Sequence, residues 1–207
     1  HPTLLKLKLL FRRIMKKIIL TIFAVASLFL YTSQTYAFSV SVGIPMSHSL
    51  GGYVYSNNTK QSYGNAADKT SGYFLGVQLP FFIGLGIDSY TTKFKTGNCD
   101  GCWGSQYDAG LKTTMYNLFY QLPVPFLNVI IGLGTGTTEY DCTICSSSFD
   151  KGSATQWYTS VGMPIIPFFD IHLSYRSITS KNIKLKSDGT KDDNSGSVTG
   201  IGLAFNF

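Results

Sequence analysis

Four cysteines form two pairs whose spacing is typical of metal and redox sites. They stand in Cys99-Asp100-Gly101-Cys102 and in Cys142-Thr143-Ile144-Cys145. Two such pairs can bind one zinc ion tetrahedrally, and a single pair can cycle between dithiol and disulfide. The same four residues can also form structural disulfides, for which three connectivities exist. The compartment of the protein and the elements that carry the cysteines decide between these alternatives.

A second group of residues could act as acid, base or nucleophile. The stretch "DIHLSYR" places Asp170, His172, Ser174 and Arg176 on alternate positions. A histidine near a serine can serve as base and nucleophile, whereas a carboxylate near an arginine more often forms an ion pair. Which chemistry applies depends on whether these side chains face a substrate or one another.

The first 37 residues differ in charge from the rest of the chain. Six of the seventeen lysines and arginines lie there, with no acidic residue, so that basic and acidic residues are equal in number from Phe38 onward. The basic residues of this segment are Lys6, Lys8, Arg12, Arg13, Lys16 and Lys17. A nucleic-acid partner requires a cationic face, and no such face is expected after this segment.

This N-terminal segment has the layout of a secretory signal peptide. From Met15, two lysines precede an apolar run from Ile18 to Tyr31, and a polar stretch ends at Ala37. The apolar run of about 14 residues is shorter than the roughly 20 that a membrane-spanning helix needs. We therefore expect cleavage near Ala37 rather than a helical anchor, with residues 1–14 as an upstream extension, 15–37 as the signal peptide and 38–207 as the mature domain.

Export bears directly on the cysteines. Disulfides persist in oxidising compartments, and both pairs fall in polar segments between apolar runs. We therefore predict structural disulfides at Cys99, Cys102, Cys142 and Cys145, with a metal site and redox-active or free thiols as the alternatives. No cofactor, resident metal or catalytic residue is expected.

The segments that must position these residues alternate strictly between apolar and small or polar side chains. The final "GIGLAFNF" sets Ile201, Leu203, Phe205 and Phe207 against glycine, alanine and asparagine, which is the period of a β-strand. The same alternation predicts eight strands, at residues 38–46, 71–79, 82–94, 108–121, 127–140, 154–163, 168–180 and 196–207.

The small residues opposite the apolar face distinguish two all-β folds. The second face of a soluble sandwich carries mainly Lys, Glu, Thr and Arg, whereas glycine, serine, alanine and asparagine suit the crowded inside of a narrow barrel. The apolar face then points outward, which is stable in lipid. The sequence therefore predicts an eight-stranded antiparallel up-and-down transmembrane β-barrel.

The connections between the predicted strands alternate in length. Three are short and carry proline, at Pro80, at Pro123 with Pro125, and at Pro164 with Pro167. The other four are long and polar, at residues 47–70, 95–107, 141–153 and 181–195. Short turns on the periplasmic side and long loops outside are typical of bacterial outer-membrane barrels.

Aromatic residues are expected to form two girdles at the membrane interfaces. The turn-side group comprises Phe81, Phe82, Phe126, Phe168, Phe169 and Phe207. The loop-side group comprises Tyr53, Tyr73, Tyr90, Trp103, Tyr107, Tyr140, Trp157 and Tyr158.

With its leader, its eight strands and its terminal phenylalanine, the mature chain resembles the small outer-membrane barrels of the OmpA and OmpX kind along its whole length. The resemblance implies the outer membrane of a Gram-negative bacterium, contact with its lipids, and recognition of the C-terminal strand by the barrel assembly machinery through Ile201, Leu203, Phe205 and Phe207. It implies no particular activity, because the family does not share one.

Strand parity places Asp88, Asp170, His172 and Arg176 inside the barrel, as a luminal cluster in which Asp170 or Asp88 pairs with Arg176. The His-x-Ser pair is similar to that of outer-membrane lipid A deacylases, but Tyr175 stands where that family has asparagine.

An eight-stranded barrel encloses little more than its own side chains. We therefore predict a structural, adhesive or surface-interaction role carried by the loops, with a surface or host partner. A narrow channel or carrier for small solutes is the first alternative, and a lipid-modifying enzyme is the second.

Overall fold

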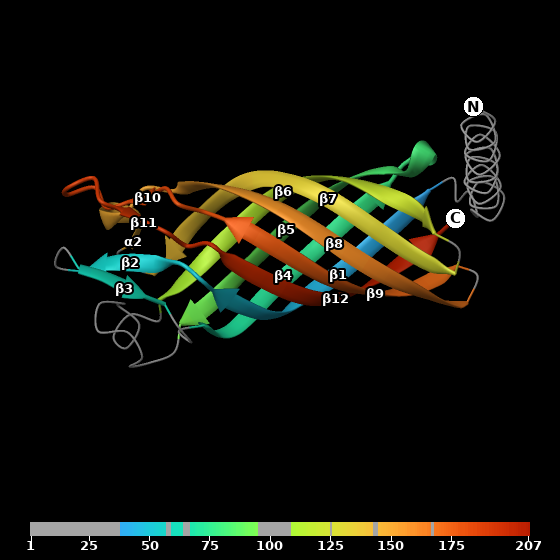
Figure 1. Cartoon of the computed structure of the whole chain (residues 1–207), viewed down its shortest axis with the longest axis horizontal. Coiled ribbons are helices and arrows are strands. Elements are labelled where there is room, and N and C mark those ends of the chain that lie inside the picture. The colour runs from blue at the N-terminus through green and yellow to red at the C-terminus, as the bar shows by residue number, and fades with distance from the viewer. Residues whose placement is uncertain are drawn as a thin grey trace, which may run out of the picture. The chain divides into compact units, whose positions relative to one another are not determined.

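Eight strands close into an antiparallel barrel in the computed structural model, which describes residues 38–56, 59–63, 67–94, 109–124, 126–142, 145–166 and 168–207. Each strand pairs with the next barrel strand, and the first pairs with the last (Figure 1). The strands are β1 (Ser39–Leu50), β4 (Ala67–Gln78), β5 (Ile83–Phe94), β6 (Gly110–Val124), β7 (Leu127–Asp141), β8 (Gly152–Ile166), β9 (Phe169–Thr179) and β12 (Gly196–Asn206). The predicted fold class and strand number are confirmed. The signal peptide falls outside the described residues and stays a prediction.

The seam that closes the barrel lies between β1 and β12. Their register runs from the pair Ser39 and Asn206 to the pair Leu50 and Gly196, with a bulge in β1 beside Pro45. The backbone amide of Phe207 donates a hydrogen bond of 2.9 Å to the carbonyl of Phe38 beyond the last strand pair. The barrel is therefore closed by segments from the two ends of the described chain.

The outer surface of the barrel is apolar and its interior is polar or small. On β7, Ile131 and Leu133 point outward and are 46% and 70% exposed, whereas Gly132 between them faces the ring of Tyr158. The other strands repeat this arrangement with the exposed residues Val42, Ile44, Leu75, Leu85, Leu118, Val161, Met163, Leu173 and Phe205. An apolar surface this extensive is stable against lipid but not against water.

The short turns raise two phenylalanines to their tips. Pro80 opens a 3-10 turn, η1 (Pro80–Phe82), in which Phe81 has a φ of 73°. Phe126, in the turn between β6 and β7, has a φ of 66°. This left-handed conformation is unfavourable for a bulky residue. It leaves the rings 86% and 90% exposed, so the turns expose rather than bury their aromatic side chains.

The sequence pattern predicted a turn at Pro164, and this prediction is wrong. Pro164 lies within β8, opposite Asp170 on β9. The register shifts between Pro164 and Ile166, and such an irregularity accommodates a residue that cannot donate to the ladder. The strand therefore continues past the proline to Ile166. Pro123, Pro125 and Pro167 fall outside the residues whose side chains are described.

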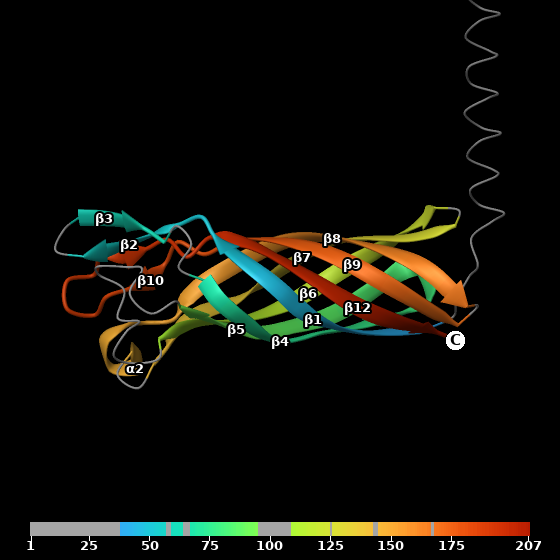
Figure 2. The ribbon, with the colours of Figure 1, turned by 90° about the horizontal axis from the view of Figure 1, so that it is seen from below.

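The loop end carries secondary structure that the sequence pattern did not predict. A hairpin of β2 (Tyr53–Ser56) and β3 (Thr59–Ser62) follows β1. A pair of two-residue strands, β10 (Ile183–Lys184) and β11 (Lys191–Asp192), precedes β12, and a single helical turn, α2 (Cys145–Ser148), follows β7. Both views place these elements at the end of the barrel opposite the C-terminus (Figure 2). No helix in the described ranges is long and apolar enough to span a membrane.

The loop-side aromatic girdle differs from the prediction. Tyr90 and Tyr158 are buried inside the barrel, because they share strand parity with the luminal residues. Tyr140 packs among the loops instead of facing lipid. The outward-facing aromatic residues at this level are Tyr73, Tyr116, Trp157 and Tyr175. Trp103 and Tyr107 lie outside the described residues.

Candidate functional site

The centre of the lumen is occupied by an ion pair between Arg176 on β9 and Asp88 on β5. The Nε of Arg176 donates to Oδ2 of Asp88 at 2.9 Å, and Nη2 donates to Oδ1 at 3.4 Å. The two residues are 5% and 1% exposed. The guanidinium also lies 3.5 Å from the ring centroid of Phe74 and 5.0 Å from that of Tyr158, which adds cation–π attraction. Of the two partners that the sequence allowed for Arg176, the structure places Asp88 in contact.

Two amide side chains extend this pair into a layer across the barrel. Gln156 on β8 donates from Nε2 to Asp88 at 2.7 Å and to Oδ1 of Asn117 on β6 at 2.6 Å. Ser174 accepts a hydrogen bond of 2.6 Å from Nη1 of Arg176. Hydrogen-bonding side chains from four strands therefore meet across the lumen at this level, and the bonds made by Asp88 and Arg176 are charge-assisted. We call Asp88, Asn117, Gln156, Ser174 and Arg176 the central layer.

A second polar layer lies nearer the short turns, around Asp170. Its carboxylate accepts from Nδ2 of Asn206 on β12 at 2.8 Å and from Nδ2 of Asn128 on β7. Asn128 in turn accepts from Gln121 at 2.7 Å. His172 lies beside this layer, with Nε2 3.9 Å from Asp170. We call Asp170, Asn206, Asn128, Gln121 and His172 the turn-side layer.

His172 does not form the predicted pair with Ser174. Its Nδ1 lies 3.1 Å from Oγ of Ser160 on β8, whereas Ser174 bonds to Arg176. His172 and Ser174 both face a cavity of about 60 Å³ between the two layers. A buried water occupies roughly 10–15 Å³ on this scale, so the cavity has room for about four to six waters. It has no room for an acyl chain or a sugar.

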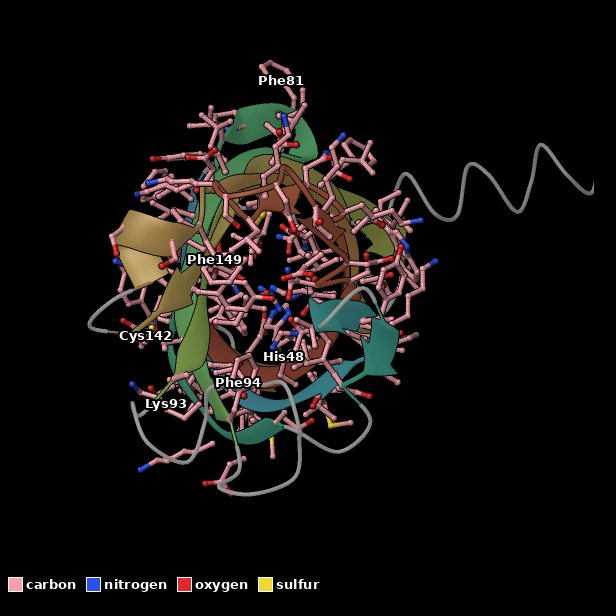
Figure 3. All side chains as sticks on the ribbon, turned by 90° about the vertical axis from the view of Figure 1, so that its left-hand side faces the viewer. His48, Phe81, Lys93, Phe94, Cys142 and Phe149 are labelled. Carbon is pink, nitrogen blue, oxygen red and sulfur yellow. The ribbon has the colours of Figure 1, made fainter. Side chains whose placement is uncertain are left out.

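The loop end is closed by a small hydrophobic core above the lumen. Tyr63 stacks on Phe94 with ring centroids 5.7 Å apart. Around them pack the buried residues Leu50, Val54, Ala109, Leu111 and Ile183, with Tyr140, Cys142 and Phe149 at the edge. Figure 3, which looks into this end, shows His48 within the ring of strands and Lys93 outside it. We call this group of residues the loop core.

Hydrogen bonds fix the loop core to the last loop. The hydroxyls of Tyr63 and Tyr140 lie 2.6 Å apart. Tyr140 donates to Asp192 at 2.8 Å, and Tyr63 donates to Asn194. Burial raises the pKa of Tyr63 above its usual range, because the tyrosinate would lose its hydration. The connections after β1, β5, β7 and β9 are thereby joined in one structure.

The cysteines are only partly described. Cys142 belongs to the edge of the loop core. Cys99, Cys102 and the side chain of Cys145 lie outside the described residues, so the pairing stays a prediction. Among the described side chains no group of three or more potential metal ligands occurs.

The predicted C-terminal signal residues lie on the outer face of β12. Ile201, Phe205 and Phe207 are 36%, 41% and 72% exposed, and Leu203 is partly exposed. The ring of Phe205 packs edge-on against Phe169 of β9, with centroids 5.2 Å apart. The residues therefore form one apolar column at the closing seam, accessible from the lipid side.

The luminal cluster that the sequence predicted left out most of the polar residues that form the two layers. Asn117, Gln121, Asn128, Gln156 and Asn206 complete both layers, and each has the inward parity of its strand. Amide residues at inward positions are the signal that would have found them. No comparable signal in the sequence joins Tyr63, Tyr140, Asp192 and Asn194, because they come from the connection after β1, the end of β7 and the connection after β9.

The apolar exterior, closed sheet and cross-braced polar lumen together define an eight-stranded, membrane-spanning β-barrel. No family model and no curated protein matches the chain in sequence. Among solved structures it is similar to Neisserial surface protein A, with 13% identity, a TM-score of 0.46 and coverage of 83% of this chain and 97% of the other.

Two further solved structures are similar to the same extent. For the outer membrane protein W of E. coli the identity is 15%, the TM-score is 0.47 and the coverage is 84% and 98%. For the outer membrane protein AlkL the identity is 10%, the TM-score is 0.49 and the coverage is 82% and 89%.

Proposed function

We propose that this chain is an outer-membrane barrel whose lumen is permanently closed and whose role is structural, adhesive or surface-interacting, carried by the loops. The observation that supports this proposal most is that two separate groups of side chains block the lumen. The central layer crosses the lumen with an ion pair and three further hydrogen-bonding side chains, and the loop core covers the outer end of the lumen. Material passing through would have to disrupt both.

The outer-membrane location rests on the asymmetry of the two ends. Short apolar turns with Phe81 and Phe126 at their tips lie at one end, and polar loops with their own strands lie at the other. This arrangement suits a barrel inserted with its turns towards the periplasm. Fractionation of the envelope, followed by gel migration with and without heating, tests location and barrel together. Recovery in the inner membrane, or migration that heating does not change, would refute the proposal.

The loops are the part that a surface partner would meet. The hairpin of β2 and β3, the helical turn α2 and the strands β10 and β11 are held on one hydrophobic core, so they present a defined surface. We propose that disulfides from Cys99, Cys102, Cys142 and Cys145 stiffen this surface. Mass spectrometry with alkylation before and after reduction tests this: four thiols alkylated without reduction would contradict it.

A narrow channel is the functional alternative, and the cavity between the layers is the feature that favours it. Conductance across planar bilayers separates the two roles. We expect no discrete openings for the wild-type barrel, because the ion pair of Arg176 and Asp88 spans the path. Sustained unitary openings from protein that shows heat-modifiable migration would overturn the closed-lumen proposal.

An enzyme acting on lipid A is the remaining alternative. His172 and Ser174 face inward, and His172 is 7% exposed. Lipid substrates approach from the outer face, so these residues cannot reach them. Replacing His172 or Ser174 by alanine should leave the acylation of lipid A unchanged. A change detected by mass spectrometry of extracted lipid A would revive the enzymatic role.

A further inference from the structure

The turn-side layer holds a carboxylate whose two oxygens are used unequally. Oδ2 of Asp170 accepts hydrogen bonds from the amide nitrogens of Asn206, at 2.8 Å, and of Asn128. Oδ1 of Asp170 is buried and accepts no hydrogen bond from any residue that the structure describes. The residue as a whole is 1% exposed. A buried carboxylate oxygen without a partner is unfavourable, because it has lost its hydration and gained nothing in exchange.

The charge of Asp170 is not balanced by the guanidinium in the lumen. Arg176 stands six residues further along β9, which is about 20 Å at the usual rise of a strand, and it pairs with Asp88. Apart from His172, the central and turn-side layers contain two carboxylates and one guanidinium, so one negative charge is left over. Buried charges in proteins are normally paired or bound to a metal ion. The described part of the lumen therefore lacks one positive charge.

The hydrogen bonds of His172 are those of a neutral histidine. Oγ of Ser160 donates to the carbonyl of Leu173 at 3.3 Å, so it accepts from Nδ1 of His172 at 3.1 Å. Nε2 of His172 is buried without a partner among the described residues, 3.9 Å from Asp170. A second proton on Nε2 would lie beyond hydrogen-bonding distance of the carboxylate. A proton on Oδ1 of Asp170 would find no described acceptor either, so neither group supplies the missing charge in this arrangement.

A cavity of about 10 Å³ borders Asp170, separate from the larger cavity between the layers. One water needs roughly 10–15 Å³ on this scale, so the cavity has room for one water or one small ion. Besides the carboxylate, a serine hydroxyl and amide groups from four strands line it: Ser39, Gln78, Gln121, Asn128 and Asn206. The hydrogen bonds that Gln121 and Asn206 make in this layer use their amide nitrogens, which leaves the amide oxygen of each as a potential ligand.

We propose that this small cavity is a binding site for one alkali cation, Na⁺ or K⁺, with Asp170 as its charged ligand. Carboxylate and carbonyl oxygens are the ligands that hard cations prefer. A single positive charge brings the two layers to neutrality, whereas a divalent ion leaves a buried excess and a water molecule leaves the deficit. Asn128 is partly exposed beside the turn between β6 and β7, so the ion enters from the turn side. The bound ion joins side chains of six strands.

Urea unfolding of the barrel in zwitterionic micelles tests the site, with NaCl or KCl replacing N-methylglucamine chloride at constant total salt. The organic cation is too large for the cavity. If Kd is at or below about 30 mM, the folding equilibrium constant should rise about five- to tenfold between about 30 and 300 mM Na⁺ or K⁺. Asp170→Asn keeps the shape of the side chain without its charge and should abolish this rise. Asp68→Asn, which removes an exposed carboxylate at the start of β4, is the control and should keep it.

Equal stability of the wild type in all three salts would assign the cavity to water and overturn the proposal. A rise that Asp170→Asn retains would place the ion elsewhere, and a larger effect of CaCl₂ at matched ionic strength would refute a monovalent site. Sodium dependence that appears only in His172→Gln would assign the missing charge to a protonated histidine. If Asp170→Asn does not fold, ²³Na NMR of the wild type decides: saturable broadening supports the site, and broadening that only grows with sodium concentration contradicts it.

Discussion

Replacing Arg176 by methionine should destabilise the barrel by about 3–5 kcal/mol, the usual cost of leaving one charge of a buried pair alone. Methionine keeps much of the side-chain volume but removes both hydrogen bonds to Asp88 and the contact of the guanidinium with the ring of Phe74 at 3.5 Å. Asp88 then retains Gln156 as a donor, at 2.7 Å. One neutral amide does not replace a bidentate guanidinium.

The assay is a double-mutant cycle in urea, on barrels folded in detergent micelles and followed by tryptophan fluorescence and far-ultraviolet circular dichroism. Asp88→Asn, Arg176→Met and the double variant complete the cycle. Because the double variant leaves no unpaired charge, it should be more stable than Arg176→Met, with a coupling energy of at least about 2 kcal/mol. A loss below about 1 kcal/mol for Arg176→Met, or additive single losses, would refute the view that this pair braces the lumen.

Three further outcomes are expected. Gly136→Ala on β7 should prevent folding or lower the free energy of unfolding by several kcal/mol, because the added Cβ would lie 1.9 Å from a backbone carbonyl oxygen of β6. Gly51→Ala is the control: its Cβ would lie 3.9 Å from the nearest atom, so this variant should show the gel migration of the folded wild type. Ile131→Arg should lower the stability of the barrel in phospholipid vesicles by about 2–4 kcal/mol and Thr137→Arg by about 0–1 kcal/mol, because only Ile131 lies within the apolar belt. Equal losses of stability would show that the apolar belt does not end between these two residues. Burial raises the pKa of Tyr63 above the ordinary value of 10.0, so the stability that Tyr63 contributes is complete below pH 10 and is lost progressively as the pH rises above it. Tyr63→Phe should reduce the difference in unfolding free energy between pH 8 and pH 11.

Parity along each strand was enough to predict the barrel, since every boundary lies within four residues of its prediction. It also placed Asp88 and Arg176 in the lumen, but it could not choose between Asp88 and Asp170 as the partner of Arg176. That choice depends on the stagger between strands, which sets the height of each side chain. The misplacement of Tyr90 and Tyr158 in a girdle came from reading aromatic residues by position along the strand and ignoring their parity.

The loop core was beyond such reasoning for a different reason. Tyr63 and Ile183 come from two connections and Phe94 from the end of β5; the three are far apart in sequence, and no period links them. Their contacts exist only after the strands have brought the loops to one end.

The seam between β1 and β12 sets the order in which this protein can be completed. Ser39 must pair with Asn206, so seven strands are translated and exported before the one that closes the sheet. Until β12 arrives, the backbone donors and acceptors of β1 and β9 form two open edges, which invite pairing with other chains. A pairing this distant in sequence is also slow to form. A chain truncated before Gly196 would consequently be an open sheet prone to aggregation and not a smaller barrel.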